Sequence, residues 1–353
     1  HLFSESLLAG TPEGPAGRRT RRLRKPRAER LAEPFTINDG RLRFDGNRHT
    51  FGQSPLLIFD ACAIAQAARV PFGHGLRDAA VRNLASVDRG FRASPEAAGA
   101  FLGLLRGRGR VGHVLRLMHE VGLLGRYLPE FGRISLLIQH DLYHHYTIDE
   151  HTLKAVEALD EIDGARDTQR AHLRAVFDEV EDGALLYLSV LLHDIGKGAG
   201  GGHIARGVKI AERVARRLRL GAEATAKVVL LVKHHVTMAH LALRRDLSEP
   251  RVAQDLAAQV GSLDALNMLL LLTYADLNAV APGVWSDWKG ALLWDLYQRT
   301  RTCLTGAPAD GREEIPRYKK QVATALGGEL PPSEIERHIA LLPRRYARAT
   351  RPE

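Results

Sequence analysis

The chain has 353 residues, 45% apolar and 26% charged, which is long enough to bury the core of one or two domains. An aromatic share of 6% favours a helical protein over an all-β sandwich. The two cysteines lie far apart, which excludes a disulfide framework and a cysteine zinc site and fits a cytoplasmic protein. No apolar run reaches roughly 18 residues without a charge, so we expect no membrane span.

The net charge of +9 lies mainly at the two ends of the chain. Residues 1–30 carry +5 and residues 343–353 carry +3, which leaves +1 for the rest. Because the body is nearly neutral, we expect solvated tails and no nucleic-acid partner. The first residue is His, and no signal peptide follows it, so we expect a fragment of a longer protein.

Four segments follow one another along the chain. Residues 1–33 are a basic disordered or linker segment, and residues 34–138 form a helical leader that opens with a hairpin around Asp39-Gly40. In that leader, Ser94 with Pro95 and Glu96 has the pattern of a helix start. Residues 139–305 form a second helical domain, and residues 306–353 form a C-terminal tail that we expect to be flexible. The helices predicted in the second domain cover 147–162, 184–197, 204–219, 222–239, 250–260, 263–280 and 287–304.

Imidazole and carboxylate groups recur at the ends of apolar helices in the second domain. His193-Asp194 follows LLYLSVLL, the pair His234-His235 ends KVVLLVK, and Asp276 follows LNMLLLLTYA. Burying such groups is costly unless they are paired or bind a metal. With His151 and His203, they form a candidate metal site.

Nitrogen and oxygen ligands of this kind suit Mn²⁺, Fe, Mg²⁺ or Zn²⁺, although Mg²⁺ becomes less favoured as imidazoles accumulate. A set of His, His-Asp and Asp holds one ion, and a second ion requires further ligands with Asp194 as the bridge. Two ions about 3.5–4 Å apart are a known arrangement for the hydrolysis of phosphate esters.

The order His, His-Asp, Asp resembles the HD superfamily of metal-dependent phosphohydrolases, which are all-α proteins. Five blocks over about residues 55–304 narrow the resemblance: LMHEVGLLGRYLPEFGRI, DLYHHYTIDEHTL, LLHDIGKGAGGGH, RRDLSEP and LTYADLNAVAPGVWSDWKGALLWDLY. They are similar to the bifunctional uridylyltransferase/uridylyl-removing enzymes that act on the nitrogen-regulatory PII protein. The resemblance implies an HD-type helical bundle preceded by the helical leader.

The resemblance also implies an activity: metal-dependent hydrolysis of the phosphodiester that joins UMP to a tyrosine of a PII-type partner. The first ion would be bound by His151, His193, Asp194 and Asp276. The second would be bound by Asp194, His203 and one or both of His234 and His235. Lys197 would lie near the phosphate, and His144 would orient a ligand or assist the leaving tyrosine.

Some family features are missing from the sequence. It has neither the Gly-rich stretch followed by Asp-x-Asp of the nucleotidyltransferase domain nor room for the glutamine-sensing repeats, so these residues do not support uridylyl addition. Gly202 and Ile204 flank His203 where members commonly carry an acid and a small hydroxyl, which weakens the second metal site. The alternatives are hydrolysis of a small nucleotide and a fragment or degenerate member that binds PII without turnover. The native metal, glutamine regulation and the oligomeric state are left open.

Overall fold

Helices make up most of the structure, so the all-α prediction is confirmed. The structure is a computed structural model that describes residues 29–30, 34–46, 50–137, 146–164, 168–198, 200–281, 283–306 and 337. The predicted basic disordered or linker segment, residues 1–33, and the predicted C-terminal tail, residues 306–353, lie almost entirely outside these residues.

A small antiparallel sheet in the order β1-β2-β3 opens the described chain. Its strands are β1 (Glu29–Arg30), β2 (Phe35–Asn38) and β3 (Arg41–Phe44). The predicted hairpin is confirmed: Asp39 and Gly40 join β2 to β3 with φ of 53° and 67°, the positive values that a tight two-residue hairpin turn requires. Phe35 and Leu42 are buried, and the amide of Leu42 donates to the carbonyl of Pro71, so the hairpin is fixed to the helices that follow.

Short helices form the leader. They are α1 (Thr50–Gln53), α2 (Leu56–Ala68), α3 (His74–Arg82), the 3₁₀ helix η1 (Leu84–Ser86), α4 (Arg89–Arg92), α5 (Pro95–Leu105), α6 (Val111–Glu120), α7 (Leu123–Tyr127) and α8 (Pro129–Gly132). The predicted helix start is confirmed, because the Ser94 hydroxyl accepts from the amide of Ala97 at 3.1 Å and Pro95 occupies the first turn. α2 packs against α5 and α6.

Longer helices form the second domain. They are α9 (Ile148–Gly164), α10 (Thr168–Asp178), α11 (Gly183–Leu192), α12 (His203–Arg217), α13 (Ala222–His234), α14 (Thr237–Arg244), α15 (Pro250–Val260), α16 (Leu263–Val280) and α17 (Asp287–Thr305). The predictions for α15 and α16 are confirmed to the residue, whereas α10 was missed. The single helix predicted over 222–239 was wrong, because it is split into α13 and α14.

The same local contact accompanies two helix ends that the sequence placed too late. In a continuous helix, the carbonyl of Val190 would accept from the amide four residues on, but it accepts from Nδ1 of His193 at 2.7 Å, and α11 ends at Leu192. The carbonyl of Val232 likewise accepts from Nδ1 of His235 at 2.7 Å, where α13 ends. Both helix ends therefore occur at histidines of the predicted metal site.

The central helix of the second domain is α16, which packs against α9, α10, α11, α13 and α17. It is long and apolar enough to cross a membrane by length and composition alone, with a mean hydropathy of 1.2, but 72% of it is buried. Burial of that kind is typical of a core helix.

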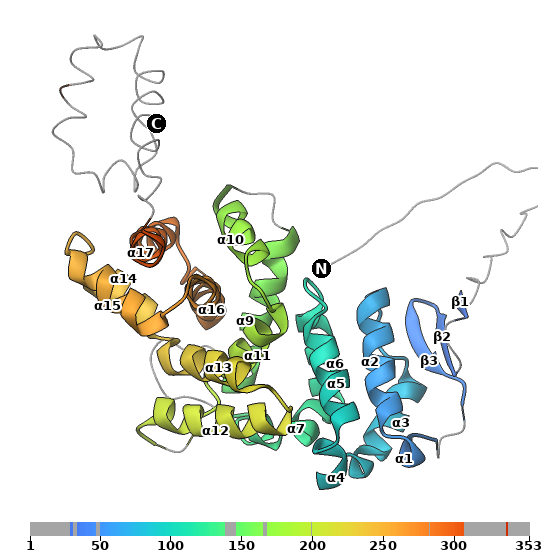
Figure 1. Cartoon of the computed structure of the whole chain (residues 1–353). Helices are drawn as coiled ribbons and strands as arrows, with labels where there is room; N and C mark the ends of the chain where they lie inside the picture. The colour runs from blue at the N-terminus through green and yellow to red at the C-terminus, as the bar shows by residue number, and fades with distance from the viewer. Residues whose placement is uncertain are drawn as a thin grey trace, which may run out of the picture.

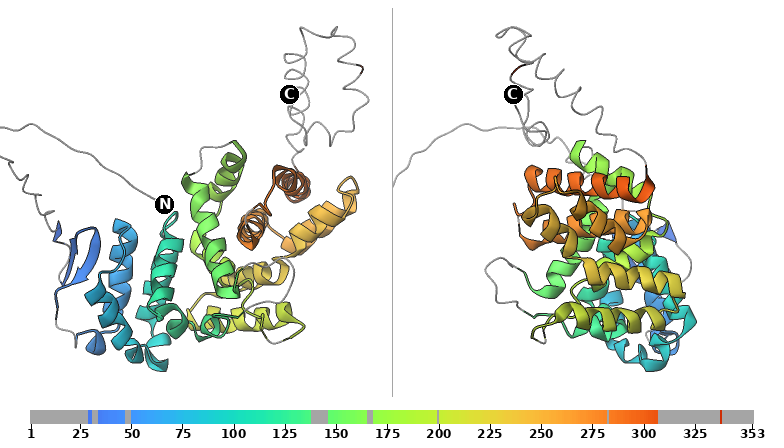
Figure 2. Two further views of the ribbon diagram at one scale, coloured as in Figure 1. Left: turned by 180° about the vertical axis from the view of Figure 1, so that it is seen from behind. Right: turned by 60° about the vertical axis from the view of Figure 1, so that its left-hand side comes forward.

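The two helical parts lie side by side, with the sheet at one edge and α15 and α17 at the other (Figures 1 and 2). Contacts of α5 with α11 and of α6 with α9 join the parts. Their buried apolar side chains form one continuous cluster. The start of α9 and the ends of α11 and α13 are therefore held against a common core.

Candidate metal centre

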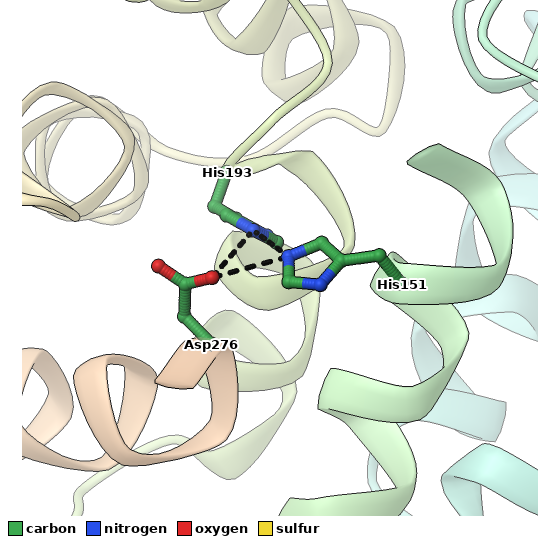
Figure 3. A group of neighbouring side chains, drawn as sticks. All are labelled: His151, His193 and Asp276. Atoms are coloured by element: carbon green, nitrogen blue, oxygen red, sulfur yellow. Dashed lines mark hydrogen bonds and ion pairs between the residues drawn. The ribbon is translucent and has the colours of Figure 1, made fainter. Parts of the chain in front are cut away.

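Three helices bring His151, His193 and Asp276 together. His151 lies in the first turn of α9, His193 directly follows α11, and Asp276 lies in the last turns of α16, so the three side chains converge from different directions (Figure 3). The Nε2 atoms of the two histidines are 3.2 Å apart. Oδ1 of Asp276 lies 3.1 Å from Nε2 of His151 and 3.6 Å from Nε2 of His193. These three ligand atoms are spaced closely enough to bind one metal ion.

A second group consists of Asp194, His203 and His235, whose ligand atoms also lie within 4.8 Å of one another. His203 begins α12, and His235 follows α13. Nε2 of His235 lies 3.7 Å from Oδ1 of Asp194.

Asp194 joins the two groups, because its carboxylate oxygens face different partners. Oδ2 lies 3.4 Å from Nε2 of His193 and 3.7 Å from Nε2 of His151, whereas Oδ1 is directed to His235. Among the residues that the structure describes, no hydrogen bond reaches the buried Oδ1. An orphaned buried carboxylate oxygen is costly, and a bound cation would satisfy it.

Backbone contacts fix the orientation of two of the imidazoles. Nδ1 of His193 and of His235 each donates to the carbonyl three residues earlier, so in the neutral ring the lone pair lies on Nε2. Both Nε2 atoms point toward the carboxylates. A hydrogen bond at the other ring nitrogen is the usual support of a metal-binding histidine.

The charged groups in the cluster shift one another's pKa values. Burial alone would lower the pKa of His193, but the carboxylates of Asp194 and Asp276 raise it to about 10. Burial would raise the pKa of Asp194, but His193 and Lys197 hold it well below its usual range. Burial lowers the pKa of His235, and the neighbouring His193 lowers it further. The proton on His193 and the ammonium of Lys197 thus balance the negative charge of the carboxylates. Divalent ions would balance the same charge when bound. The donor set of imidazole nitrogens and carboxylate oxygens fits a divalent metal such as Mn²⁺, Fe or Zn²⁺.

The remaining predicted site residues have different locations. Lys197 lies at the candidate metal centre, with its Nζ 2.6 Å from Oδ2 of Asp194. His234 lies outside both groups: it is half-buried, and Nδ1 of its ring is 3.3 Å from Oγ1 of Thr237. The prediction was that one or both of these adjacent histidines bind the second ion, and the geometry supports His235. His144 lies outside the described residues.

Sequence reasoning missed Asp149, which supports the start of α9. Its buried carboxylate accepts from the amide of Leu136 at 3.1 Å, and the same oxygen lies 3.4 Å from Nε2 of His119 on α6. Burial would raise the pKa of Asp149, but the hydrogen bonds from His119, the Thr147 side chain and the Leu136 amide lower it to about 2. The sequence signal was an acid two residues before His151, which is equally typical of an ordinary first helical turn.

Two family models match the chain. Residues 35–127 match the model described as the third domain of uridylyltransferase GlnD, and residues 140–269 match the HD domain.

Three similar curated proteins are each described as a bifunctional uridylyltransferase/uridylyl-removing enzyme. The protein of Azospirillum brasilense is 38% identical over 312 residues, covering 87% of this chain and 33% of the relative. That of Methylococcus capsulatus is 42% identical over 260 residues, covering 71% of this chain and 30% of the relative. That of Erythrobacter litoralis is 34% identical over 321 residues, covering 90% and 34%. The chain thus spans about a third of the length of the curated relatives it matches.

Among solved structures, a tRNA-processing enzyme is 14% identical with a TM-score of 0.43, covering 67% of this chain and 59% of that chain. That likeness is too distant to bear on function.

Proposed function

Because the chain belongs to the family of bifunctional uridylyltransferase/uridylyl-removing enzymes through its GlnD third domain and its HD domain, we propose that it is a metal-dependent phosphodiesterase. Its substrate would be a PII-type protein uridylylated on tyrosine, and its product would be UMP. The relatives' names support the removal of a uridylyl group, and the buried His/Asp groups support metal-dependent hydrolysis.

The observation that carries the proposal is the position of Asp194 between two groups of potential ligands. His151, His193 and Asp276 would hold one ion, and His203 with His235 would hold another, with one oxygen of Asp194 available to each. Bound divalent ions at such a site supply Lewis-acid stabilisation of phosphoryl oxygens and a nucleophile near neutral pH.

Among the residues that the structure describes, Lys197 is well placed to meet a phosphate. Its side chain is 15% exposed and its ammonium lies against Asp194, so the positive charge is held at the candidate metal centre. An ammonium here acts as a point charge that favours an anionic substrate. The leaving phenolate of tyrosine has a pKa of about 10, so strong proton donation by the protein is unnecessary.

The decisive experiment measures UMP release from uridylylated PII by the purified chain with Mn²⁺, beside the variant Asp194→Asn. We expect release by the wild type and a loss of about 10³-fold in the variant, because several kcal/mol of transition-state stabilisation depend on the ions. The isosteric change keeps the fold, which circular dichroism checks.

The same preparation separates the alternatives. If the wild type releases no UMP from the protein but hydrolyses a cyclic dinucleotide or a nucleoside phosphate, the chain is a nucleotide hydrolase and the PII proposal is wrong. The chain is a binding module if three results are found together: the wild type and Asp194→Asn bind uridylylated PII equally tightly, neither hydrolyses any substrate, and elemental analysis finds no metal.

A further inference from the structure

Arg206 makes three hydrogen bonds to the backbone of the loop that connects the HD dipeptide to α12. Its Nε donates to the carbonyl of Gly196 at 3.1 Å. Its two terminal nitrogens donate to the carbonyls of Gly201 and Gly200, each at 2.5 Å. A guanidinium presents five donors in a rigid fork, so one side chain can hold several carbonyls that an ammonium cannot span.

The loop needs such support because of its composition. Gly198, Gly200 and Gly202 adopt positive φ values of 88°, 76° and 74°, which glycine reaches without strain. Glycine loses more conformational entropy on folding than any other residue, so a loop with several glycines is costly to hold in one conformation. The residue that caps α12 is Gly202, which provides no side-chain hydrogen bond to the first turn of the helix. Arg206, in the first turn of α12, supplies an attachment from the helix to the loop instead.

The loop connects the two halves of the candidate metal centre. Asp194 lies before it, Lys197 lies within it, and His203 lies directly after it. Gly196 is packed so closely against α12 that a Cβ there would lie 2.0 Å from the carbonyl oxygen of His203. Where the loop is held therefore decides how far the imidazole of His203 lies from the Asp194 carboxylate.

We propose that Arg206 is a positioning residue, whose bonds to Gly196, Gly200 and Gly201 order this loop and hold His203 in place for the Asp194–His203–His235 group. The inference deepens the proposed function and rests on it for the role of the second ion. Arg206 does not belong to either ligand group itself.

The test uses the full chain with Arg206→Lys, which keeps the charge and removes the fork, and Arg213→Lys as the matched control. Arg213 is an exposed arginine of the same helix. Hydrogen exchange of the metal-free proteins reports the order of the loop, and calorimetric titration with Mn²⁺ resolves the binding steps. For Arg206→Lys we expect about tenfold faster exchange in residues 196–198 and 200–203, and about tenfold weaker binding in one Mn²⁺ step. The other step and the Arg213→Lys protein should match the wild type.

The proposal is overturned if loop exchange and both Mn²⁺ steps of Arg206→Lys equal those of the wild type. It is also overturned if exchange rises throughout the protein and both steps weaken together, since that pattern indicates general destabilisation. Should Arg206→Lys fail to fold, Arg206→Gln is measured against the same two criteria. If the wild type binds no Mn²⁺, the proposed function fails, and loop exchange alone then decides whether Arg206 orders the loop.

Discussion

His234 and His235 are neighbours in the chain but lie in different surroundings. His235 is 1% exposed, and its ring centroid is 5.4 Å from that of His193, whereas His234 is half-buried beside Thr237. Successive residues at the end of a helix point about 100° apart, so only one of such a pair can face a given site. At the turn between α13 and α14, His235 is the one of the two that faces Asp194.

We therefore expect His235→Gln to weaken one Mn²⁺ binding step by roughly 100-fold, because glutamine lacks the imidazole nitrogen that faces Asp194. His234→Gln is the matched control, and its binding should stay within about twofold of the wild type. Calorimetric titration measures both. The opposite ranking of the two variants would show that the ligand set is misassigned.

At the scale of elements, the junction between the HD dipeptide and α12 depends on one glycine. Gly196 lies against the first two turns of α12, where a Cβ would also lie 2.5 Å from the amide nitrogen of Gly207. These contacts are with backbone, which cannot move aside as a flexible side chain can. Gly201, in the same loop, has open space around it and no positive φ.

Gly196→Ala should consequently lower the free energy of unfolding by about 1–3 kcal/mol, the usual cost of overpacking. Gly201→Ala should change it by no more than about 0.5 kcal/mol. Urea unfolding followed by circular dichroism compares the two with the wild type. Equal stabilities for the two variants would mean that α12 does not approach the HD dipeptide this closely.

At the scale of the whole molecule, ion pairs join the leader to the second domain. Both oxygens of Glu130 on α8 accept from Arg217 on α12, at 2.8 and 2.9 Å. Arg116 on α6 pairs with Glu150 and Glu157 on α9. Since the buried apolar side chains also form one cluster, we expect the leader and the second domain to unfold together.

The pair of Glu130 and Arg217 should make the stability of the protein depend on pH. Burial would raise the pKa of Glu130, but the hydrogen bonds and charge of Arg217 outweigh it and lower the pKa. A group whose pKa is lower in the folded state stabilises the protein above its unfolded pKa, about 4.3 for Glu, and loses that contribution as the pH falls through the folded value.

Glu130→Gln should thus be less stable than the wild type by about 1 kcal/mol at pH 7, and the difference should shrink steadily below about pH 4. Thermal unfolding from pH 7 to 3 measures it. Glu212→Gln on α12 is the control, because Glu212 makes no ion pair among the residues that the structure describes. A difference that persists unchanged at low pH would show that the charge of Glu130 is not its source.

Much of the fold could be predicted from local sequence patterns. The turn at Asp39-Gly40, the helix start at Ser94 and the bounds of α15 and α16 depend on residues close in the chain, and each was predicted correctly. The breaks after α11 and α13 could not be predicted from the apolar pattern, which continues past them; at each break a buried histidine side chain donates to the carbonyl three residues earlier.

The sequence by itself determined the helical class and the order of the imidazole and carboxylate groups, since apolar periodicity and motif order are local properties. Tertiary structure decided which of these groups meet. It placed His235 rather than His234 against Asp194, gave the two oxygens of Asp194 different partners and directed Arg206 to the glycine loop. The physical reason is that a metal site depends on distances of a few ångströms between helices, and only the packing of the whole core fixes those distances.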